Sequence, residues 1–454
     1  MLRIALPLAL AEVGWMSMGV VDTVLVGHLR DSAVALSASG LAQVFYNTLA
    51  YGIGGVLLGL DTTIAQAHGA EDWRAANGWF GQGLLLAGAI SVLLIVLLGA
   101  VAPIGLLRLH SDRQVLALAV RTLRALDWGV APLLLYFAMR RYLQAFNHVR
   151  LIAATLISAN LVNLLFDWLL IFGHRWQIVG VVVAWAPLGV VGSGIATSLA
   201  RVYQMLFMAG AIVWVDRRNG YGLLAGLRAS LRPHWANLRR LIALGAPAGA
   251  TILVEIAVFA VVTVLIATLG PVPLAGHEIV LNCVSFTFMI PLGISAAASV
   301  RVGQAIGRGS VEEARAAGGT AIALGAGAMA LCAVVYLSVP YGLASLFTHD
   351  ARVIRATVPL FFIAAVFQFC DGLQVTATGA LRGLGDTHSA LVTHLCSYWL
   401  LGLPLGVWLC FSEKLGPRGL WIGLCVSLVL TGVVLLARWR WQIGRVRMGN
   451  VAVS

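Results

Sequence analysis

The sequence contains few charged residues. Asp, Glu, Lys and Arg make up 11% of its 454 residues, whereas apolar residues make up 60% and the mean hydropathy is +0.93. In soluble globular proteins about a quarter of the residues are charged, because the surface must face water. This composition excludes a soluble protein and predicts that most of the chain lies in a lipid bilayer.

Motifs of the common enzyme classes are also missing. No Gly-rich loop ends in Lys-Ser or Lys-Thr, no His pair has zinc-ligand spacing, and there is no nucleophile elbow. The glycine-rich segment GALRGLG at 379–385 has neither the Lys nor the preceding strand of a phosphate loop. The six cysteines lie in or beside apolar runs and are expected to be small buried hydrophobic residues. We therefore expect no enzyme activity and no cofactor.

Apolar runs recur along the chain at the length that crosses a membrane, which is about 20 residues for roughly 30 Å of hydrocarbon. Twelve transmembrane helices are predicted, at 4–27, 33–60, 79–105, 115–139, 151–173, 189–215, 241–268, 275–300, 319–347, 357–380, 389–411 and 419–437. The run 115–139 is the least apolar, with Arg121, Arg124 and Asp127, and Asp127 is expected to pair with Arg124. The predicted fold class is an all-α membrane protein.

Basic residues divide unequally between the predicted loops. Even-numbered loops and the C-terminal tail hold eighteen of them, and odd-numbered loops hold eight. Since cytoplasmic loops are enriched in Lys and Arg, both termini are expected in the cytoplasm of a multi-pass protein of a bacterial inner (plasma) membrane. This topology accounts for the net charge of +12, so no nucleic-acid partner is expected.

The two halves of the chain resemble each other. DTVLVGHL at 22–29 aligns with VTVLIATL at 262–269, and AQAHG at 65–69 aligns with GQAIG at 303–307. Six spans per repeat give both halves the same orientation, so a pseudo-twofold axis along the membrane normal should relate them. Such repeats are typical of secondary transporters that bind substrate near the midplane.

These patterns predict a domain organisation with three parts. They are an N-terminal six-helix lobe at 1–215, a basic cytoplasmic linker at 216–240 and a C-terminal six-helix lobe at 241–454.

Acidic residues at membrane depth are the strongest functional signal. An ionised carboxylate at the bilayer centre costs about 2.5–3.5 kcal/mol. Glu255 and Asp371 have no Arg or Lys in their own spans, so each should carry a proton or bind a cation, and we predict both as coupling residues. Glu12 and Asp61 lie near span ends and are expected to be ordinary interfacial groups.

A second polar group lies in the first half. Asn160, Asn163 and Asp167 share one stripe of a helix, and Asp22 lies late in the first span. For Asp22 and Asp167, coupling and structural roles both stay open.

A substrate cavity is predicted in the second half, with ordinary helix packing as the alternative for its aromatic residues. The candidate lining residues are Phe259, Asn282, Phe286, Met289, Phe367 and Gln374.

Segments along the whole chain resemble the multidrug and toxic compound extrusion (MATE) family, particularly its NorM-like bacterial branch. They include VVDTVLVGHL at 20–29, NLLFDWLLIFG at 163–173, LVEIAVFAVV at 253–262, AGHEIVLN at 275–282, SVRVGQAIG at 299–307, CDGLQVTATGALRGLGDT at 370–387 and SYWLLGLPLG at 397–406. The resemblance implies two six-helix lobes that export cationic and amphipathic compounds against inward Na⁺ or H⁺.

The resemblance also implies roles for individual residues. Glu255 and Asp371 match acids tied to cation binding, and would be the metal ligands if the ion is Na⁺. Asp22, Asn163 and Asp167 match a first-lobe cluster linked to coupling, and Pro7 matches a proline associated with bending of the first helix. The NorM-like pattern can have a Tyr four residues before the second acid. Here that position is Phe367, so Na⁺ and H⁺ both stay open.

The predicted function is secondary active efflux of drugs or metabolites by Na⁺ or H⁺ antiport with alternating access. The expected partners are small cationic or amphipathic molecules and the lipid bilayer, and a monomer is expected. The alternative is a lipid-linked oligosaccharide flippase, which would favour an Arg-lined cavity, whereas few Arg lie at membrane depth. A membrane enzyme or respiratory subunit would need catalytic residues in the loops, which are short.

Overall fold

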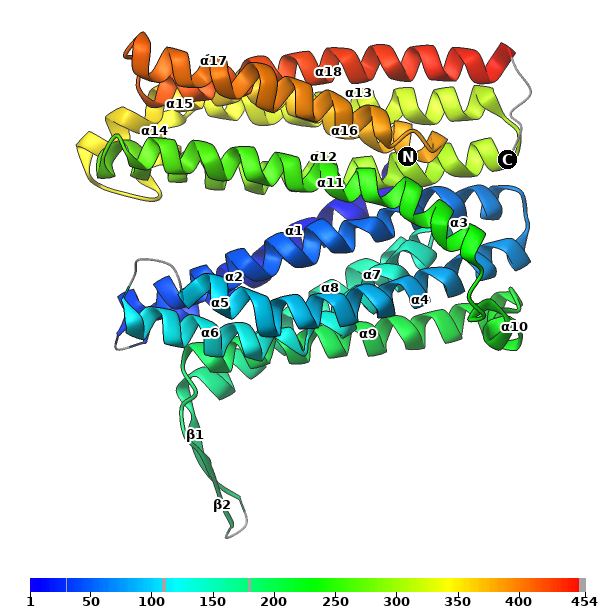
Figure 1. The fold of residues 1–454 in the computed structure, drawn as a ribbon, viewed down its shortest axis with the longest axis horizontal. Helices are drawn as coiled ribbons and strands as arrows, with labels where there is room; N and C mark the ends of the chain where they lie inside the picture. The colour runs from blue at the N-terminus through cyan, green and yellow to red at the C-terminus, as the bar shows by residue number, and fades with distance from the viewer. Residues whose placement is uncertain (30, 108–111, 179–180, 449–454) are drawn as a thin grey trace. The chain divides into compact units, whose positions relative to one another are not determined.

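The computed structural model describes residues 1–29, 31–107, 112–178 and 181–448, and this part of the chain is almost entirely helical (Figure 1). Eleven of its helices are long and apolar enough to cross a membrane. Lipid offers no hydrogen bonds to the backbone, so an apolar chain satisfies its N–H and C=O groups within helices. The predicted fold class of an all-α membrane protein is confirmed.

The helices of the first half extend beyond most of the predicted apolar runs. They are α1 (Leu2–Gly27), α2 (Ser32–Gly54), η1 (Gly55–Leu58), α3 (Gly59–Gly69), α4 (Trp73–Val96), η2 (Leu97–Val101), α5 (Ala102–Leu107), α6 (Arg113–Asp127), α7 (Val130–Ala145), α8 (Val149–Phe172) and α9 (Val190–Asn219). α2, η1 and α3 follow one another without a break as a single span of 38 residues. The ends of these helices are polar, so a search for apolar runs did not include them.

The second half of the chain is also built from helices. It consists of α10 (Leu223–Ser230), α11 (Trp235–Ala267), α12 (Pro271–Gly307), α13 (Val311–Ser338), α14 (Pro340–Ser345), α15 (Ala351–Leu384), α16 (His388–His394), η3 (Leu395–Gly402), α17 (Leu403–Val407), η4 (Trp408–Ser412) and α18 (Pro417–Met448). The segments from α16 to η4 form one span, in which η3 and η4 are π-helical.

The predicted span 115–139 is two helices, α6 and α7, which meet at Trp128 and Gly129. Ser198 of α9 donates hydrogen bonds to the carbonyls of Ala125 and Leu126 at the end of α6, at 2.8 and 3.4 Å. A Cβ added to Gly129 would lie 2.6 Å from the Ser198 Oγ, so only glycine allows this approach. The break arises from this tertiary contact, which hydropathy cannot register.

The prediction that Asp127 forms an ion pair with Arg124 is also wrong. Arg124 is exposed, and no ion pair joins it to Asp127 in the described part of the chain. The Oδ1 atom of Asp127 is buried and has no hydrogen-bond partner in the described residues. The two residues are neighbours on one helix, but their side chains enter different surroundings.

A β-hairpin occupies a segment that we expected to be a loop between the fifth and sixth spans. β1 (His174–Ile178) pairs antiparallel with β2 (Val181–Trp185), and His174 lies opposite Trp185. In Figure 1 the hairpin extends away from the helices around it. The run of Val in β2 favours a strand, a signal that the search for apolar helices passed over.

The structure separates into two compact units. Unit 1 contains residues 1–12, 61–72 and 243–454, and unit 2 contains residues 13–60 and 73–242. Each unit therefore corresponds broadly to one half of the sequence, but the first turns of α1 and most of α3 pack with the second half.

The packing of α3 in unit 1 joins the two repeated motifs found in the sequence. A Cβ added to Gly69 would lie 2.1 Å from the Gln304 carbonyl oxygen, and one added to Gly307 would lie 2.0 Å from the Gln66 carbonyl oxygen. AQAHG at 65–69 and GQAIG at 303–307 thus contact each other reciprocally. Glycine at these positions permits helix backbones to touch.

The basic segment 216–240 is folded within unit 2. The carboxylate of Asp216 accepts hydrogen bonds from the backbone N–H groups of Leu223 and Leu224, both at 2.9 Å, at the start of α10. The Gln82 side chain of α4 donates to the Ser230 and Arg232 carbonyls at 2.9 and 2.7 Å. The predicted linker is therefore an ordered element attached to α4, and its cytoplasmic location stays a prediction.

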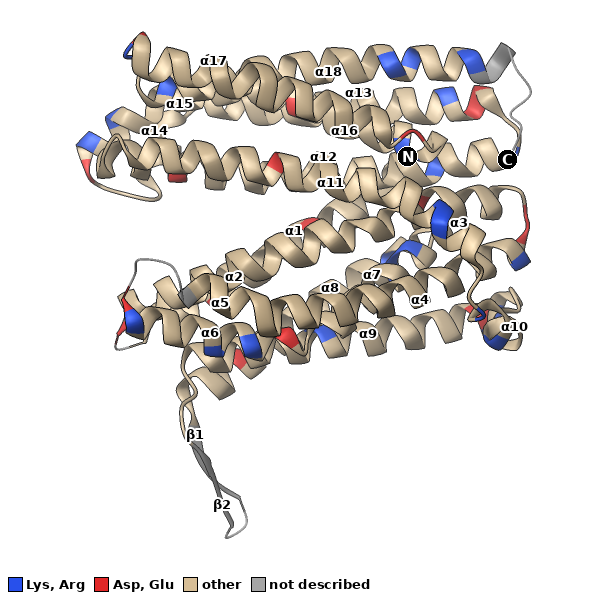
Figure 2. Ribbon diagram, in the orientation of Figure 1, with Lys and Arg blue, Asp and Glu red and all other residues tan. Residues whose placement is uncertain are grey.

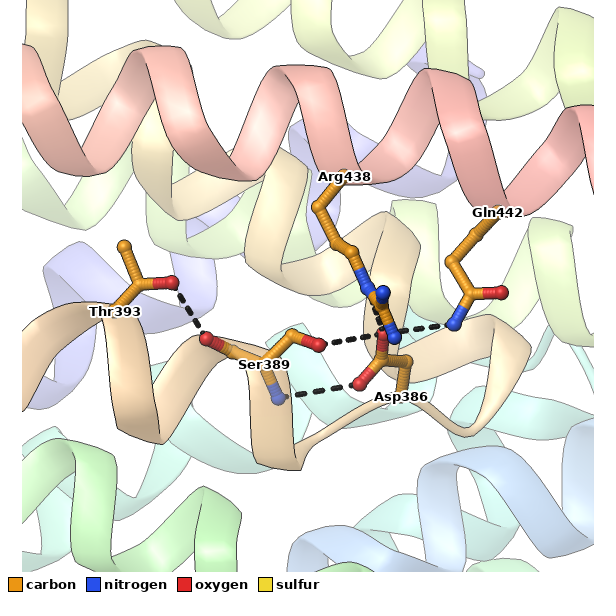
Figure 3. A network of polar contacts seen from close by, with 5 residues as sticks. All are labelled: Asp386, Ser389, Thr393, Arg438 and Gln442. Atoms are coloured by element: carbon orange, nitrogen blue, oxygen red, sulfur yellow. Dashed lines mark hydrogen bonds and ion pairs between the residues drawn. The ribbon is translucent and has the colours of Figure 1, made fainter.

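Charged residues lie mainly toward helix ends and in the connections, and most of the helix length is uncharged (Figure 2). One connection carries a charged network in unit 1, around Asp386 between α15 and α16 (Figure 3). Arg438 and Gln442 of α18 donate to the Asp386 Oδ2 atom at 2.8 and 3.0 Å, and the Ser389 hydroxyl donates to it at 2.8 Å. This network ties the turn to α18.

Candidate functional site

Two of the predicted coupling acids, Glu255 and Asp371, share a hydrogen-bonding partner in unit 1. Glu255 lies on α11, whereas Asp371 and Gln374 lie one turn apart on α15. The Gln374 amide donates to Glu255 Oε1 at 3.2 Å and to Asp371 Oδ1 at 3.0 Å. The two carboxyl groups are thus held on either side of one amide.

Among the described residues, the surroundings of these acids contain no counter-charge. Neither Glu255 nor Asp371 forms an ion pair within the described residues, and Asp371 is 2% exposed. The neighbouring core consists of side chains such as Val258, Phe361 and Phe367. Two ionised carboxylates in such a place would repel each other and lack solvation, so the pair needs a proton or a cation.

Several oxygens at this site have no hydrogen-bond partner in the part of the chain that the structure describes. Asp371 Oδ2, Gln374 Oε1 and the Tyr398 hydroxyl are all buried and unpaired. Tyr398 belongs to η3 and interacts electrostatically with both Glu255 and Asp371. Tyr398 does not stand out in the sequence, because a tyrosine in an apolar run is more often a packing residue.

The first-half cluster comes together in unit 2. The Asn163 amide of α8 donates to Asp22 Oδ1 of α1 at 3.0 Å and also bonds Asp167 Oδ2. Thr197 of α9 donates to Asp22 Oδ2 at 3.1 Å. All four side chains are buried. The Asp22 and Asp167 carboxyls also interact electrostatically, so two ionised carboxylates here would repel each other.

Unlike the acids of unit 1, this cluster has a basic neighbour. Arg201 of α9 is 6% exposed and interacts electrostatically with Asp22. Its guanidinium carbon lies 4.3 Å from the centre of the Tyr46 ring, a cation–π contact. Thr197 and Arg201 are one turn apart on α9, a spacing that could have indicated a polar face, but neither was assigned to this cluster from the sequence.

The predicted cavity residues occupy different environments. Phe367 is 1% exposed and packs against Phe259 and Trp421, with ring centres 6.1 and 5.8 Å apart. Asn282 is exposed, and its amide donates to the Glu278 carbonyl of its own helix at 2.8 Å. Phe286 is 50% exposed, Met289 is partly buried and Gln374 is buried between the acids. Their assignment to a substrate cavity stays a prediction.

Two further residues singled out from the sequence are Pro7 and Asp61. Pro7 lies inside α1, where its missing N–H leaves the carbonyl four residues earlier without its helical bond. Asp61 is not an ordinary interfacial group, because it is 1% exposed and pairs with Arg382 at 3.3 Å. This ion pair lies in unit 1 and joins α3 to α15, so Asp61 is paired with a residue from the second half of the sequence.

One protein-family model, MatE, matches the chain twice, at residues 7–169 and 247–408. The two matches together cover more than half of the chain. They begin 240 residues apart, which agrees with the internal repeat found in the sequence.

Solved structures of MATE transporters are similar along the full length. The eukaryotic MATE transporter AtDTX14 is 20% identical, with a TM-score of 0.81, and the match covers 98% of this chain and 97% of that one. A multidrug resistance MATE family transporter in an outward-facing conformation is 19% identical, with a TM-score of 0.85 and coverage of 99% and 96%. A MOP superfamily transporter from Pyrococcus furiosus is 18% identical, with a TM-score of 0.85 and coverage of 98% and 96%. At these identities the likeness concerns the fold.

Proposed function

This chain belongs to the MatE family of multi-pass membrane transporters, and from that premise we propose that it exports small cationic or amphipathic molecules by antiport with a monovalent cation. The single observation that carries this proposal is the acid pair of unit 1. Glu255 and Asp371 share the Gln374 amide and have no basic partner in the described chain.

The electrostatics of the pair support exchange of cations. With both carboxylates ionised the site is strongly unfavourable in lipid, and a bound proton or Na⁺ relieves that cost. A cationic substrate relieves the same cost. If the site holds only one positive species at a time, binding of the coupling ion favours release of the substrate. Binding of the substrate likewise favours release of the coupling ion. This competition would couple the two movements in an alternating-access cycle.

The cluster of Asp22, Asn163 and Asp167 is a second possible coupling site. Arg201 already supplies a positive charge near Asp22, so this cluster has less need of a mobile cation than the acid pair of unit 1. We therefore assign the coupling ion to Glu255 and Asp371. The proposed location is a bacterial inner membrane, with a monomeric protein and both termini in the cytoplasm.

Reconstitution in liposomes tests this function. Purified protein is placed in vesicles loaded with a fluorescent cationic dye, and either a Na⁺ gradient or a pH gradient is imposed without ATP. We expect one of the two gradients to drive dye movement at least about tenfold faster than in protein-free vesicles. Asp371→Asn should reduce the driven rate to that background, because the amide cannot carry the coupling charge.

The matched control is Asp350→Asn, which makes the same chemical change in an exposed pair with Arg352. It should transport like the wild type. If neither gradient moves dye through the wild-type protein, antiport of cationic dyes is wrong. If Asp371→Asn transports normally, Asp371 has no part in coupling.

A further inference from the structure

The Tyr398 hydroxyl is a polar atom whose environment lacks a hydrogen-bond partner. The side chain is 0% exposed and lies in the hydrophobic core of unit 1. Its hydroxyl has no partner within the described residues. Burying an unpaired hydroxyl costs about 1–3 kcal/mol, so a phenylalanine would be the better residue here for packing alone. The hydroxyl therefore needs another explanation.

The position of η3 places this tyrosine at the acid pair. The indole of Trp399, the next residue, donates a hydrogen bond to the carbonyl of Val254 at 3.2 Å. Val254 immediately precedes Glu255 on α11. Tyr398 also interacts electrostatically with both Glu255 and Asp371. The turn of η3 that carries Tyr398 is thereby attached beside the carboxylates.

The unpaired atoms at this site are all oxygens. Besides the Tyr398 hydroxyl, Asp371 Oδ2 and Gln374 Oε1 are buried without a partner among the described residues. A proton on the Asp371 carboxyl would provide one O–H donor, which can satisfy only one of the amide and phenol oxygens. A hard cation binds carboxylate, amide and hydroxyl oxygens together. This oxygen set favours a metal cation over a proton.

We propose that Tyr398, with Gln374, supplies neutral oxygen ligands to a Na⁺ ion held by Glu255 and Asp371. This inference rests on the proposed antiport function and identifies its coupling ion. The phenol comes from η3, and it provides a hydroxyl that the Phe367 side chain on α15 cannot. Tyr398 is thus a determinant of ion specificity in this chain.

The test compares Tyr398→Phe with Tyr336→Phe, which makes the same change at a hydroxyl that already has partners. The Tyr336 hydroxyl contacts Thr287 Oγ1 at 3.1 Å and the Gln368 amide at 3.2 Å. Two properties are measured: the Na⁺ concentration for half-maximal binding of radioactive Na⁺ to purified protein, and the rise in Tm caused by saturating Na⁺. Dye transport in vesicles is measured separately.

We expect Tyr398→Phe to raise the half-saturating Na⁺ concentration at least about tenfold, which is about 1.4 kcal/mol, and to reduce the Na⁺-induced rise in Tm. Without Na⁺ the variant should be at least as stable as the wild type, because the lost hydroxyl has no hydrogen bond within the described residues. Tyr336→Phe should bind Na⁺ like the wild type. Adding Phe367→Tyr to Tyr398→Phe should recover part of the affinity, since position 367 lies one turn before Asp371.

Three results would overturn or separate the proposals. Unchanged Na⁺ affinity in Tyr398→Phe overturns the role of Tyr398. A wild-type protein that binds no Na⁺ and moves dye only under a pH gradient also overturns it, while antiport stands. If Na⁺ binding depends on Tyr398 but no gradient moves dye, the ligand assignment is supported and the proposed export function fails.

Discussion

No basic residue in the described part of the chain pairs with the Asp371 side chain, and this predicts an unusual response to mutation. Replacing a buried, unpaired charge with a neutral amide of the same size should leave stability unchanged or increase it. We therefore expect Asp371→Asn to have a Tm in detergent at or above that of the wild type, although it has lost driven transport. Differential scanning fluorimetry measures this, with Asp350→Asn as the control.

A loss of several degrees in Asp371→Asn would show that the charge stabilises the fold. The acid would then be a structural residue, with a partner that satisfies it.

Replacing Asp386 should instead destabilise the protein, because its carboxylate accepts hydrogen bonds from Arg438, Gln442 and Ser389. Burial alone would raise the pKa of Asp386, but hydrogen bonds from Gln442, Arg438 and Ser389 outweigh burial and hold its pKa below the usual value of 3.8. A depressed pKa stabilises the folded state above the unfolded pKa, and this contribution disappears as the pH falls through the folded pKa. Asp386→Asn should therefore lower Tm at neutral pH.

The pH dependence of that difference is the measurement. The Tm gap between wild type and Asp386→Asn should be constant above about pH 5 and should shrink as the protein is acidified further. A gap that widens in acid would mean that the Asp386 pKa is raised, not lowered.

Which residues could be found from the sequence depended on how unusual they are in lipid. Glu255 and Asp371 stand out because carboxylates are rare in apolar runs, and the structure places them beside a common partner. Tyr398 and Thr197 do not stand out, since both residue types are common in membrane helices. Their environments depend on which helices pack together, and a single sequence does not contain that information.

The reciprocal contact of α3 and α12 gives a prediction for helix packing in unit 1. Gly307→Ala would place a Cβ 2.0 Å from the Gln66 carbonyl oxygen, which is backbone and cannot rotate away. We expect a loss of about 1–3 kcal/mol in stability, seen as a lower Tm in detergent.

The control is Gly319→Ala on α13, where nothing lies within 4 Å of the added Cβ. Alanine is the better helix former, so this variant should match or exceed the wild type by about 0.5–1 kcal/mol. If Gly307→Ala were as stable as Gly319→Ala, the two helices would not be in backbone contact.

Helices as elements were largely predictable, whereas their breaks were not. Hydropathy found every long apolar helix, because lipid forces such segments to be helical. The division between α6 and α7 depends on Ser198 of another helix, so no pattern within residues 113–145 predicts it. The β1–β2 hairpin is different, since its Val run was visible in the sequence and was read as an ordinary loop.

For the whole molecule, the distribution of basic residues predicts the topology. Eighteen basic residues lie in the even-numbered loops and C-terminal tail and eight lie in the odd-numbered loops. Cytoplasmic loops attract Lys and Arg, so the segment 216–240 should be cytoplasmic and the β1–β2 hairpin should face the opposite side. Both termini should lie on the side of 216–240, because an even number of spans separates them.

Epitope insertion in bacterial cells measures this arrangement. A tag inserted between β1 and β2 should be accessible to antibody or protease in intact spheroplasts, and a tag in 216–240 should become accessible only after lysis. The tag in 216–240 is the matched control, because both insertions lie in connections between helices. A tag at the C-terminus that is accessible in intact spheroplasts would reverse the orientation. The gradient that drives export would then have to be imposed from the other face of the membrane.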